Sequence, residues 1–273
     1  MQAMREHRNF PDPSRVSILT AMILLTFALA RLISTPTYPV NFSFAGLDLA
    51  FHVDLNLALT LLAAGLTAAG VDWLLRSHPS IQPGETVEHW LVPMLTSLVI
   101  GVALYTLPAG WLWWVGFALG GLLLVVVFLA EYIVVDPADM FYPAATVALT
   151  ALAFTLYLIL AVALRAMGAR ALYLVLALFL AGGLASLRTL HLRLNERWEF
   201  AWAAGIALVG TQLAAGLYFW PLSPIRFGLG LLGPVYALTL LAVSLVEGDP
   251  FRRAVIEPVV MLSVLWGLAA WLG

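Results

Sequence analysis

Long apolar runs separated by short polar connections make up most of the chain. A bilayer core about 30 Å thick requires roughly 20 apolar residues per helix, and nine runs of about this length follow one another. The pattern therefore predicts an all-α integral membrane protein with about nine transmembrane helices. We expect these helices at residues 16–33, 55–75, 89–107, 111–133, 143–164, 171–190, 199–220, 226–246 and 255–272.

The segment between the first two apolar runs, residues 34–54, has a different pattern. From Leu47 to Asn56, apolar and mostly polar residues alternate strictly, and Val40 to Phe44 also alternates. A period of two residues is typical of a β-strand, and Ala45-Gly46 is suited to a turn between two strands. We expect an exoplasmic loop or a small β-hairpin here.

Composition narrows the class of protein. The chain of 273 residues is 63% hydrophobic and 10% charged, with a mean hydropathy of +0.98, which excludes an ordinary soluble domain. A net charge of -2 gives no basic surface for nucleic acid. The absence of cysteine excludes disulfides, thiolate metal sites and a cysteine nucleophile. All 13 basic side chains are arginine, which excludes Schiff-base lysine chemistry.

The arginines predict an orientation in the membrane. A cytoplasmic N-terminus places nine of them inside and four outside, as the positive-inside rule prefers. We therefore expect a cytoplasmic tail at residues 1–15, an exoplasmic C-terminus and a location in the cell inner membrane. Ala28-Leu29-Ala30 resembles a signal-peptidase site, so cleavage of the first helix is an open alternative.

The second to fifth apolar runs are weakly similar to the sixth to ninth. Leu75-Arg76-Ser77 corresponds to Leu187-Arg188-Thr189, and Glu131 corresponds to Glu247, at offsets of 111 to 116 residues across the matched positions. This pattern predicts two four-helix units, residues 55–165 and 166–273, related as a parallel repeat. Chance similarity between apolar helices that end in Arg, Glu and Pro is the alternative.

Candidate chemistry gathers at the predicted cytoplasmic ends of the helices, since mid-span positions carry few strongly polar residues. A guanidinium with imidazoles and carboxylates suits a phosphate headgroup or a metal. The ordinary interpretation of these polar residues is that they belong to solvated loops at the membrane surface. The candidate cluster consists of Asp72, Arg76, His78, His89, Glu131, Asp136 and Asp139.

Metal sites receive little support from the sequence. Asp136 and Asp139 are similar to the aspartate-rich Mg²⁺ motifs of intramembrane prenyltransferases. However, Pro137 interrupts the helix between them, and one Asp-x-x-Asp pair is a weak signal. Asp48, His52 and Asp54 share one face of the expected strand, and such a face is more often simply hydrated. We predict no metal and no cofactor.

Several short segments together resemble an uncharacterised bacterial family of polytopic membrane proteins. They are Val71-Asp72-Trp73-Leu74-Leu75-Arg76-Ser77-His78-Pro79, His89-Trp90-Leu91, Glu131-Tyr132 and Asp136-Pro137. The resemblance covers most of the chain and implies the membrane architecture without an activity. Motifs of serine hydrolases, zinc proteases and P-loop nucleotidases do not occur.

The favoured function is that of a non-catalytic accessory, scaffold or lipid-interacting subunit. Its expected partners are membrane lipids, with other membrane subunits or a second copy of the chain as further candidates. A facilitated transporter of a small or lipidic solute is the first alternative, which the repeat and the many glycines would suit. An enzyme that modifies a lipid or isoprenoid phosphate is the second, and it requires the candidate cluster to converge in one pocket.

Overall fold

The computed structural model describes residues 11–33, 38–44, 47–53, 55–78, 81, 86–194 and 197–272. Within these residues, nine helical stretches are long and apolar enough to span a membrane, so the chain is a multi-pass membrane protein. The helices are α1 (Pro13–Leu32), α2 (Leu55–Leu75), the 3-10 helix η1 (Val87–Trp90), α3 (Leu91–Thr106), α4 (Trp111–Val134), α5 (Tyr142–Ala166), α6 (Ala171–Arg193), α7 (Phe200–Tyr218), α8 (Pro224–Val246), α9 (Phe251–Ala254) and α10 (Ile256–Trp271).

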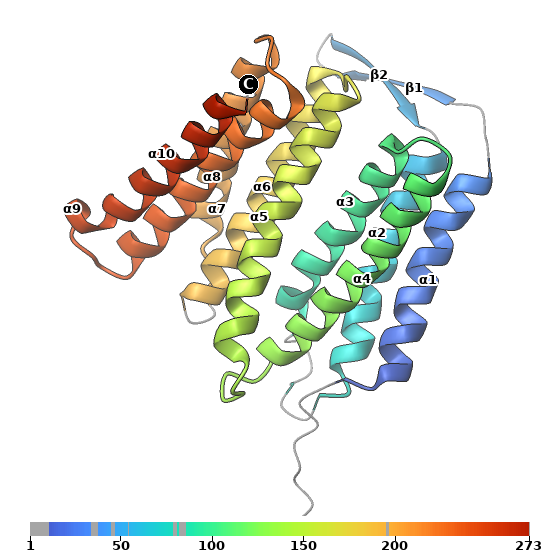
Figure 1. Ribbon diagram of the computed structural model, residues 1–273, viewed down its shortest axis with the longest axis horizontal. Coiled ribbons are helices and arrows are strands. Elements are labelled where there is room, and N and C mark those ends of the chain that lie inside the picture. The colour runs from blue at the N-terminus through green and yellow to red at the C-terminus, as the bar shows by residue number, and fades with distance from the viewer. Residues whose placement is uncertain are drawn as a thin grey trace, which may run out of the picture.

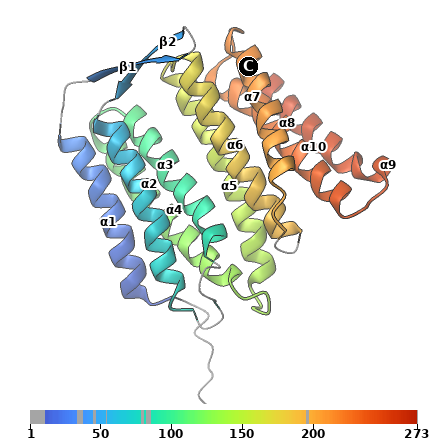
Figure 2. The ribbon, with the colours of Figure 1, turned by 180° about the vertical axis from the view of Figure 1, so that it is seen from behind.

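Two strands lie between α1 and α2. β1 (Tyr38–Phe44) and β2 (Leu47–Val53) pair antiparallel, with Tyr38 opposite Val53 and Phe44 opposite Leu47. Figures 1 and 2 show them across one end of the helices, where α1 ends and α2 begins. The strand side chains, Asp54 and residues 1–10 of the expected tail lie outside what the structure describes, so the candidate metal ligands of the strand stay predictions.

Helix ends follow from local sequence. The side chain of Asp12 accepts a hydrogen bond from Ser14 N at the start of α1, and Ser223 caps α8 in the same way. Each of these caps is followed by a proline, which suits the first turn of a helix. Gly168 follows α5 with φ +64° and Gly248 follows α8 with φ +88°, a conformation that glycine adopts without steric cost.

The helices pack as two groups of four. In the first bundle, α1 contacts α2 and α4, α2 contacts α3, and α3 contacts α4. In the second bundle, α5 contacts α6 and α8, α6 contacts α7, and α7 contacts α8. The same neighbours thus recur when α2, α3 and α4 are compared with α6, α7 and α8. The repeat itself stays a prediction, and its expected units, residues 55–165 and 166–273, divide the chain after α5 and not between the two bundles.

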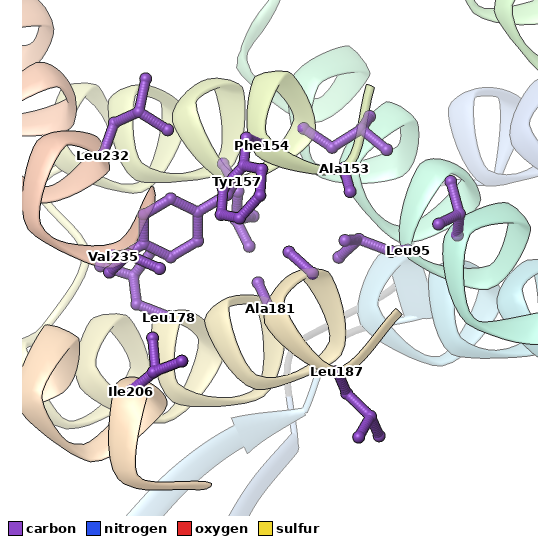
Figure 3. Packing of buried hydrophobic residues seen from close by; sticks show 14 of the residues in the cluster. Leu95, Ala153, Phe154, Tyr157, Leu178, Ala181, Leu187, Ile206, Leu232 and Val235 are labelled. Atoms are coloured by element: carbon purple, nitrogen blue, oxygen red, sulfur yellow. The ribbon is translucent and has the colours of Figure 1, made fainter. Parts of the chain in front are cut away.

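The two bundles meet along α3, α4, α5 and α6. Helices α3 and α4 contact α5, and α3 also contacts α6. Leu95, Ala153, Tyr157 and Ala181 belong to the apolar cluster that spans this contact and the second bundle (Figure 3). Helix α10 packs mainly on α8 at the margin of the molecule (Figure 1), and only 11% of the membrane span formed by α9 and α10 is buried.

The two ends of the molecule differ in charge. We call the end where α1 begins and α2 finishes the lower end, which is at the bottom of Figure 1. The lower end carries Arg15, Arg76, Arg188, Arg193, Arg197, Arg252 and Arg253 among the described residues. The opposite, upper end carries Arg31, Arg165, Arg170 and Arg226. The expected asymmetry of arginines is present, and the side of the membrane that each end faces stays a prediction.

Candidate functional site

A buried ion pair joins the two bundles near the lower end. Glu131 of α4 and Arg188 of α6 lie 2.5 Å apart, between carboxylate Oε2 and guanidinium Nη2, and their side chains are 0% and 2% exposed. His89 of η1 completes the group, with Nδ1 2.7 Å from the same carboxylate oxygen. We call these three residues the buried triad. Each charge in it is paired, as burial away from water requires.

Glu131 and Arg188 of the buried triad lie within the last turns of their helices. Arg188 precedes the end of α6 at Arg193, and Glu131 precedes the end of α4 at Val134. At a rise of 1.5 Å per residue, these positions are about 8 Å and about 5 Å from the helix ends. Helices of this length place that depth near the boundary between the lipid headgroups and the hydrocarbon core.

A polar pocket of about 180 Å³ opens beside the buried triad. Both bundles contribute to it, because its walls come from η1, the end of α4, the start of α5, the end of α6 and the segment before α7. We call it the lower pocket. Its polar and aromatic wall residues are Glu88, His89, Tyr142, Arg188, His191 and Trp198.

A second layer of charge surrounds the pocket. Glu88 lies between two imidazoles, with its carboxylate oxygens 3.7 Å from His89 Nε2 and 3.6 Å from His191 Nε2. The His191 ring also packs on Trp198, with ring centroids 4.5 Å apart. Arg188 and His191 are three residues apart on α6, a spacing that puts both side chains on one helix face. The pocket therefore presents positive, negative and aromatic groups together.

Several buried polar atoms at this site have no hydrogen-bond partner within the described part of the chain. They are Glu131 Oε1, Arg188 Nε and both ring nitrogens of His191. Such an unsatisfied group costs about 1–3 kcal/mol, and native proteins rarely retain several of them without a reason. The pocket thus has donors and acceptors suited to a polar ligand.

The residues predicted from the sequence are only partly brought together. His89 and Glu131 meet in the buried triad, whereas Asp72 forms an ion pair with Arg76 at 2.8 Å. Asp136 Oδ1 accepts from Ala138 N, and Asp139 Oδ1 accepts from Phe141 N. The two aspartates thus stabilise the turn between α4 and α5, and neither lines the lower pocket.

His78 lies beside the site rather than in it. Its ring contacts that of Tyr132 edge to face, with centroids 4.7 Å apart. Burial lowers the pKa of His78; Asp136 opposes this shift, His89 adds to it, and Asp139 opposes it. His78 is therefore an acid-sensitive group that contacts Tyr132, the residue after Glu131.

Sequence reasoning missed the second-bundle half of the site. From the sequence, Arg188 was used only to predict the orientation in the membrane and the repeat. His191 and Trp198 were not predicted as site residues. A signal was present, because Arg188 and His191 share a helix face at the end of an apolar run. Across the described residues, no three His, Asp or Glu side chains are grouped so that they could hold a metal ion.

Comparison with known proteins identifies a family. DUF5656, a family of proteins of unknown function, matches residues 34–272. The chain belongs to this family, which confirms the resemblance to an uncharacterised family of membrane proteins. No curated protein and no solved structure matches the chain.

Proposed function

We propose that this member of the DUF5656 family is a non-catalytic, lipid-interacting membrane protein that binds a phosphate-bearing lipid headgroup in the lower pocket. One observation carries the proposal. Arg188 is buried between the bundles, yet its Nε and both nitrogens of the neighbouring His191 have no hydrogen-bond partner among the described residues. The Nε–H of Arg188 and a ring N–H of His191 suit the oxygens of a phosphodiester.

The guanidinium of Arg188 has the geometry for two partners. Its Nη2 donates to Glu131, which leaves the Nε–H free for a second acceptor. Arginine binds phosphate through such a planar set of donors, and bonds between charged groups are stronger than neutral ones. A phosphate held by Arg188 and His191 would satisfy both side chains without breaking the buried triad.

The negative charge in the pocket favours a zwitterionic headgroup over a simple anion. Glu88 and Trp198 line the same pocket as Arg188 and His191. A carboxylate and an indole together suit an ammonium group, through charge and cation–π attraction. We therefore propose a headgroup of the phosphoethanolamine type, with its phosphate on Arg188 and His191 and its amine on Glu88 and Trp198.

Position and size support a headgroup as well. The buried triad is about 5–8 Å inside the helix ends, near the depth at which headgroups meet hydrocarbon. The pocket volume of about 180 Å³ accommodates a headgroup but not the acyl chains of a lipid. Membrane lipids are thus the proposed partners, and assembly with other subunits or a second copy stays a prediction.

The two alternatives have less support. A transporter requires a polar path between the bundles, and Leu95, Ala153, Tyr157 and Ala181 pack together in that interface (Figure 3). A lipid-modifying enzyme would use Asp136 and Asp139, whose carboxylates bond backbone amides of their own turn. Binding without catalysis requires neither a path nor those carboxylates.

Native mass spectrometry of protein released from nanodiscs of its own membrane lipids tests the proposal. His191→Gln alters the pocket without touching the buried triad, and Arg252→Gln is the control for loss of an exposed positive charge at the lower end. We expect the wild type and Arg252→Gln to retain phosphatidylethanolamine, and His191→Gln to retain at least about tenfold less of it, as the loss of one charge-assisted bond implies. Equal retention by all three proteins would contradict the proposal.

A further inference from the structure

A separate groove lies on the other side of the second bundle. It occupies about 340 Å³ between α5, α8 and α10, and its walls are mainly apolar. Phe154 of α5 and Tyr236 of α8 form part of the wall and pack edge to face, with ring centroids 4.8 Å apart. We call it the α10 groove. Helix α10 packs mainly on α8 and lies at the margin of the molecule (Figure 1), so the groove that it lines lies at that margin.

The α10 groove has the length of one lipid chain in one leaflet. On α5 it extends from Val147 to Leu158, and at 1.5 Å per residue this distance is about 16 Å. The hydrocarbon core is about 30 Å thick, so the groove covers about half of it. It begins near the lower end, since α5 begins there at Tyr142.

Two polar groups mark the lower part of the groove. Arg193, the last residue of α6, lines it and forms no hydrogen bond or ion pair with another described residue. The Thr150 side chain is 5% exposed, and its hydroxyl is buried without a hydrogen-bond partner in the same described set. Thr150 lies about 4.5 Å above Val147 along α5. A positive charge, a hydroxyl and an apolar track thus follow one another away from the lower end.

This order of groups matches a glycerophospholipid. We infer that the α10 groove binds an anionic phospholipid of the lower leaflet, with its phosphate on Arg193, an ester carbonyl at Thr150 and one acyl chain along α5. A guanidinium that pairs with no described residue, in a groove whose described wall residues include no carboxylate, favours a net negative headgroup. The bound chain fills the space between α10 and α5 and so holds α10 against the second bundle.

Thermal unfolding in detergent, with added phosphatidylglycerol or phosphatidylcholine of the same chains, tests this site. Phosphatidylglycerol is expected to raise the unfolding temperature of the wild type more than phosphatidylcholine does, because a ligand that binds only the folded state stabilises it. Arg193→Gln is expected to raise the half-saturating concentration of phosphatidylglycerol about tenfold or more. Arg252→Gln, which also removes a lower-end arginine but does not line the groove, is expected to behave as the wild type.

A second variant tests the position of the chain. Ala151→Phe places a ring in the groove without changing a charge, and it is expected to abolish the response to phosphatidylglycerol while the protein still unfolds cooperatively. An unchanged response in either Arg193→Gln or Ala151→Phe would overturn the inference. An equal loss in Arg193→Gln and Arg252→Gln would show attraction to general surface charge and would overturn it too. Since the lower pocket is intact in all three variants, failure here leaves the headgroup proposal standing.

Discussion

Glu131 of the first bundle lies 2.5 Å from Arg188 of the second, so a buried ion pair joins two largely apolar groups of helices. Taking two charges out of water costs several kcal/mol each, and their attraction regains this only when the geometry is good. Such a pair contributes little net stability. We infer that its role is to fix how the two bundles meet and to hold Arg188 beside the lower pocket.

Removal of one partner of the Glu131–Arg188 pair should therefore lower the free energy of unfolding more than removal of both partners does. Glu131→Gln leaves the Arg188 charge buried without its carboxylate, and we expect a loss of about 3–5 kcal/mol in the free energy of unfolding. The double variant Glu131→Leu with Arg188→Met keeps the volume apolar and should recover most of that loss. Denaturant unfolding in mixed micelles measures both. A double variant that is less stable than Glu131→Gln would show that the pair itself supplies the stability.

Close helix packing in the first bundle gives a second prediction. A Cβ atom added at Gly101 of α3 would lie 2.6 Å from the methyl group of Thr60, whereas one added at Gly65 of α2 would meet nothing within 4 Å. Gly101→Ala should destabilise the protein by about 1–3 kcal/mol, because β-branched Thr60 cannot easily turn away. Gly65→Ala is the matched control and should be neutral or slightly stabilising. Equal unfolding midpoints for the two variants would contradict the packing described.

His78 predicts how stability depends on pH. Its pKa is lowered below the ordinary 6.5 by burial, so the folded state binds fewer protons than the unfolded state. Above pH 6.5 the ring is neutral in both states, and its contribution to the stability is fully present. As the pH falls below 6.5, the unfolded state takes up a proton more readily than the folded state, so stability is lost. Between pH 7 and pH 5, we expect the unfolding temperature of His78→Gln to fall less than that of the wild type. Parallel curves for the two proteins would rule out this contribution.

The orientation of the chain is directly testable because it contains no cysteine. Ser14→Cys places a thiol at the exposed lower end of α1, and Trp220→Cys places one at the upper end after α7. The arginine distribution predicts a cytoplasmic lower end. A maleimide that does not cross membranes should label Trp220→Cys, but not Ser14→Cys, in spheroplasts with an intact inner membrane. The reverse labelling would place the lower pocket on the exoplasmic side.

The membrane spans were predictable because each apolar run is about as long as a helix that crosses the bilayer. The sixth helix shows where this reasoning ends, since α6 continues to Arg193 and not to the expected residue 190. Charged and polar residues are unfavourable in lipid, so the sequence pattern assigns Arg188 and His191 to a polar connection after the helix. The neighbouring bundle covers both side chains instead, and this can be seen only in the packed structure.

The candidate site was predictable in its location but not in its membership. Glu131 and His89 were expected at the correct end of the helices, and the structure pairs them with Arg188, which is 57 residues beyond Glu131. Contacts at that separation depend on how the bundles pack. Asp72 with Arg76, by contrast, is a local pair four residues apart on one helix, so its charges are satisfied outside the site.

The most direct test of the headgroup proposal is a measurement of ³¹P–¹⁵N dipolar coupling by solid-state NMR, with ¹⁵N-histidine-labelled protein in phosphatidylethanolamine bilayers. We expect a coupling between lipid phosphorus and His191 that is lost in His191→Gln and unchanged in His78→Gln. A wild-type protein without that coupling, or one whose coupling survives in His191→Gln, would contradict the proposal that the lower pocket holds a phosphate.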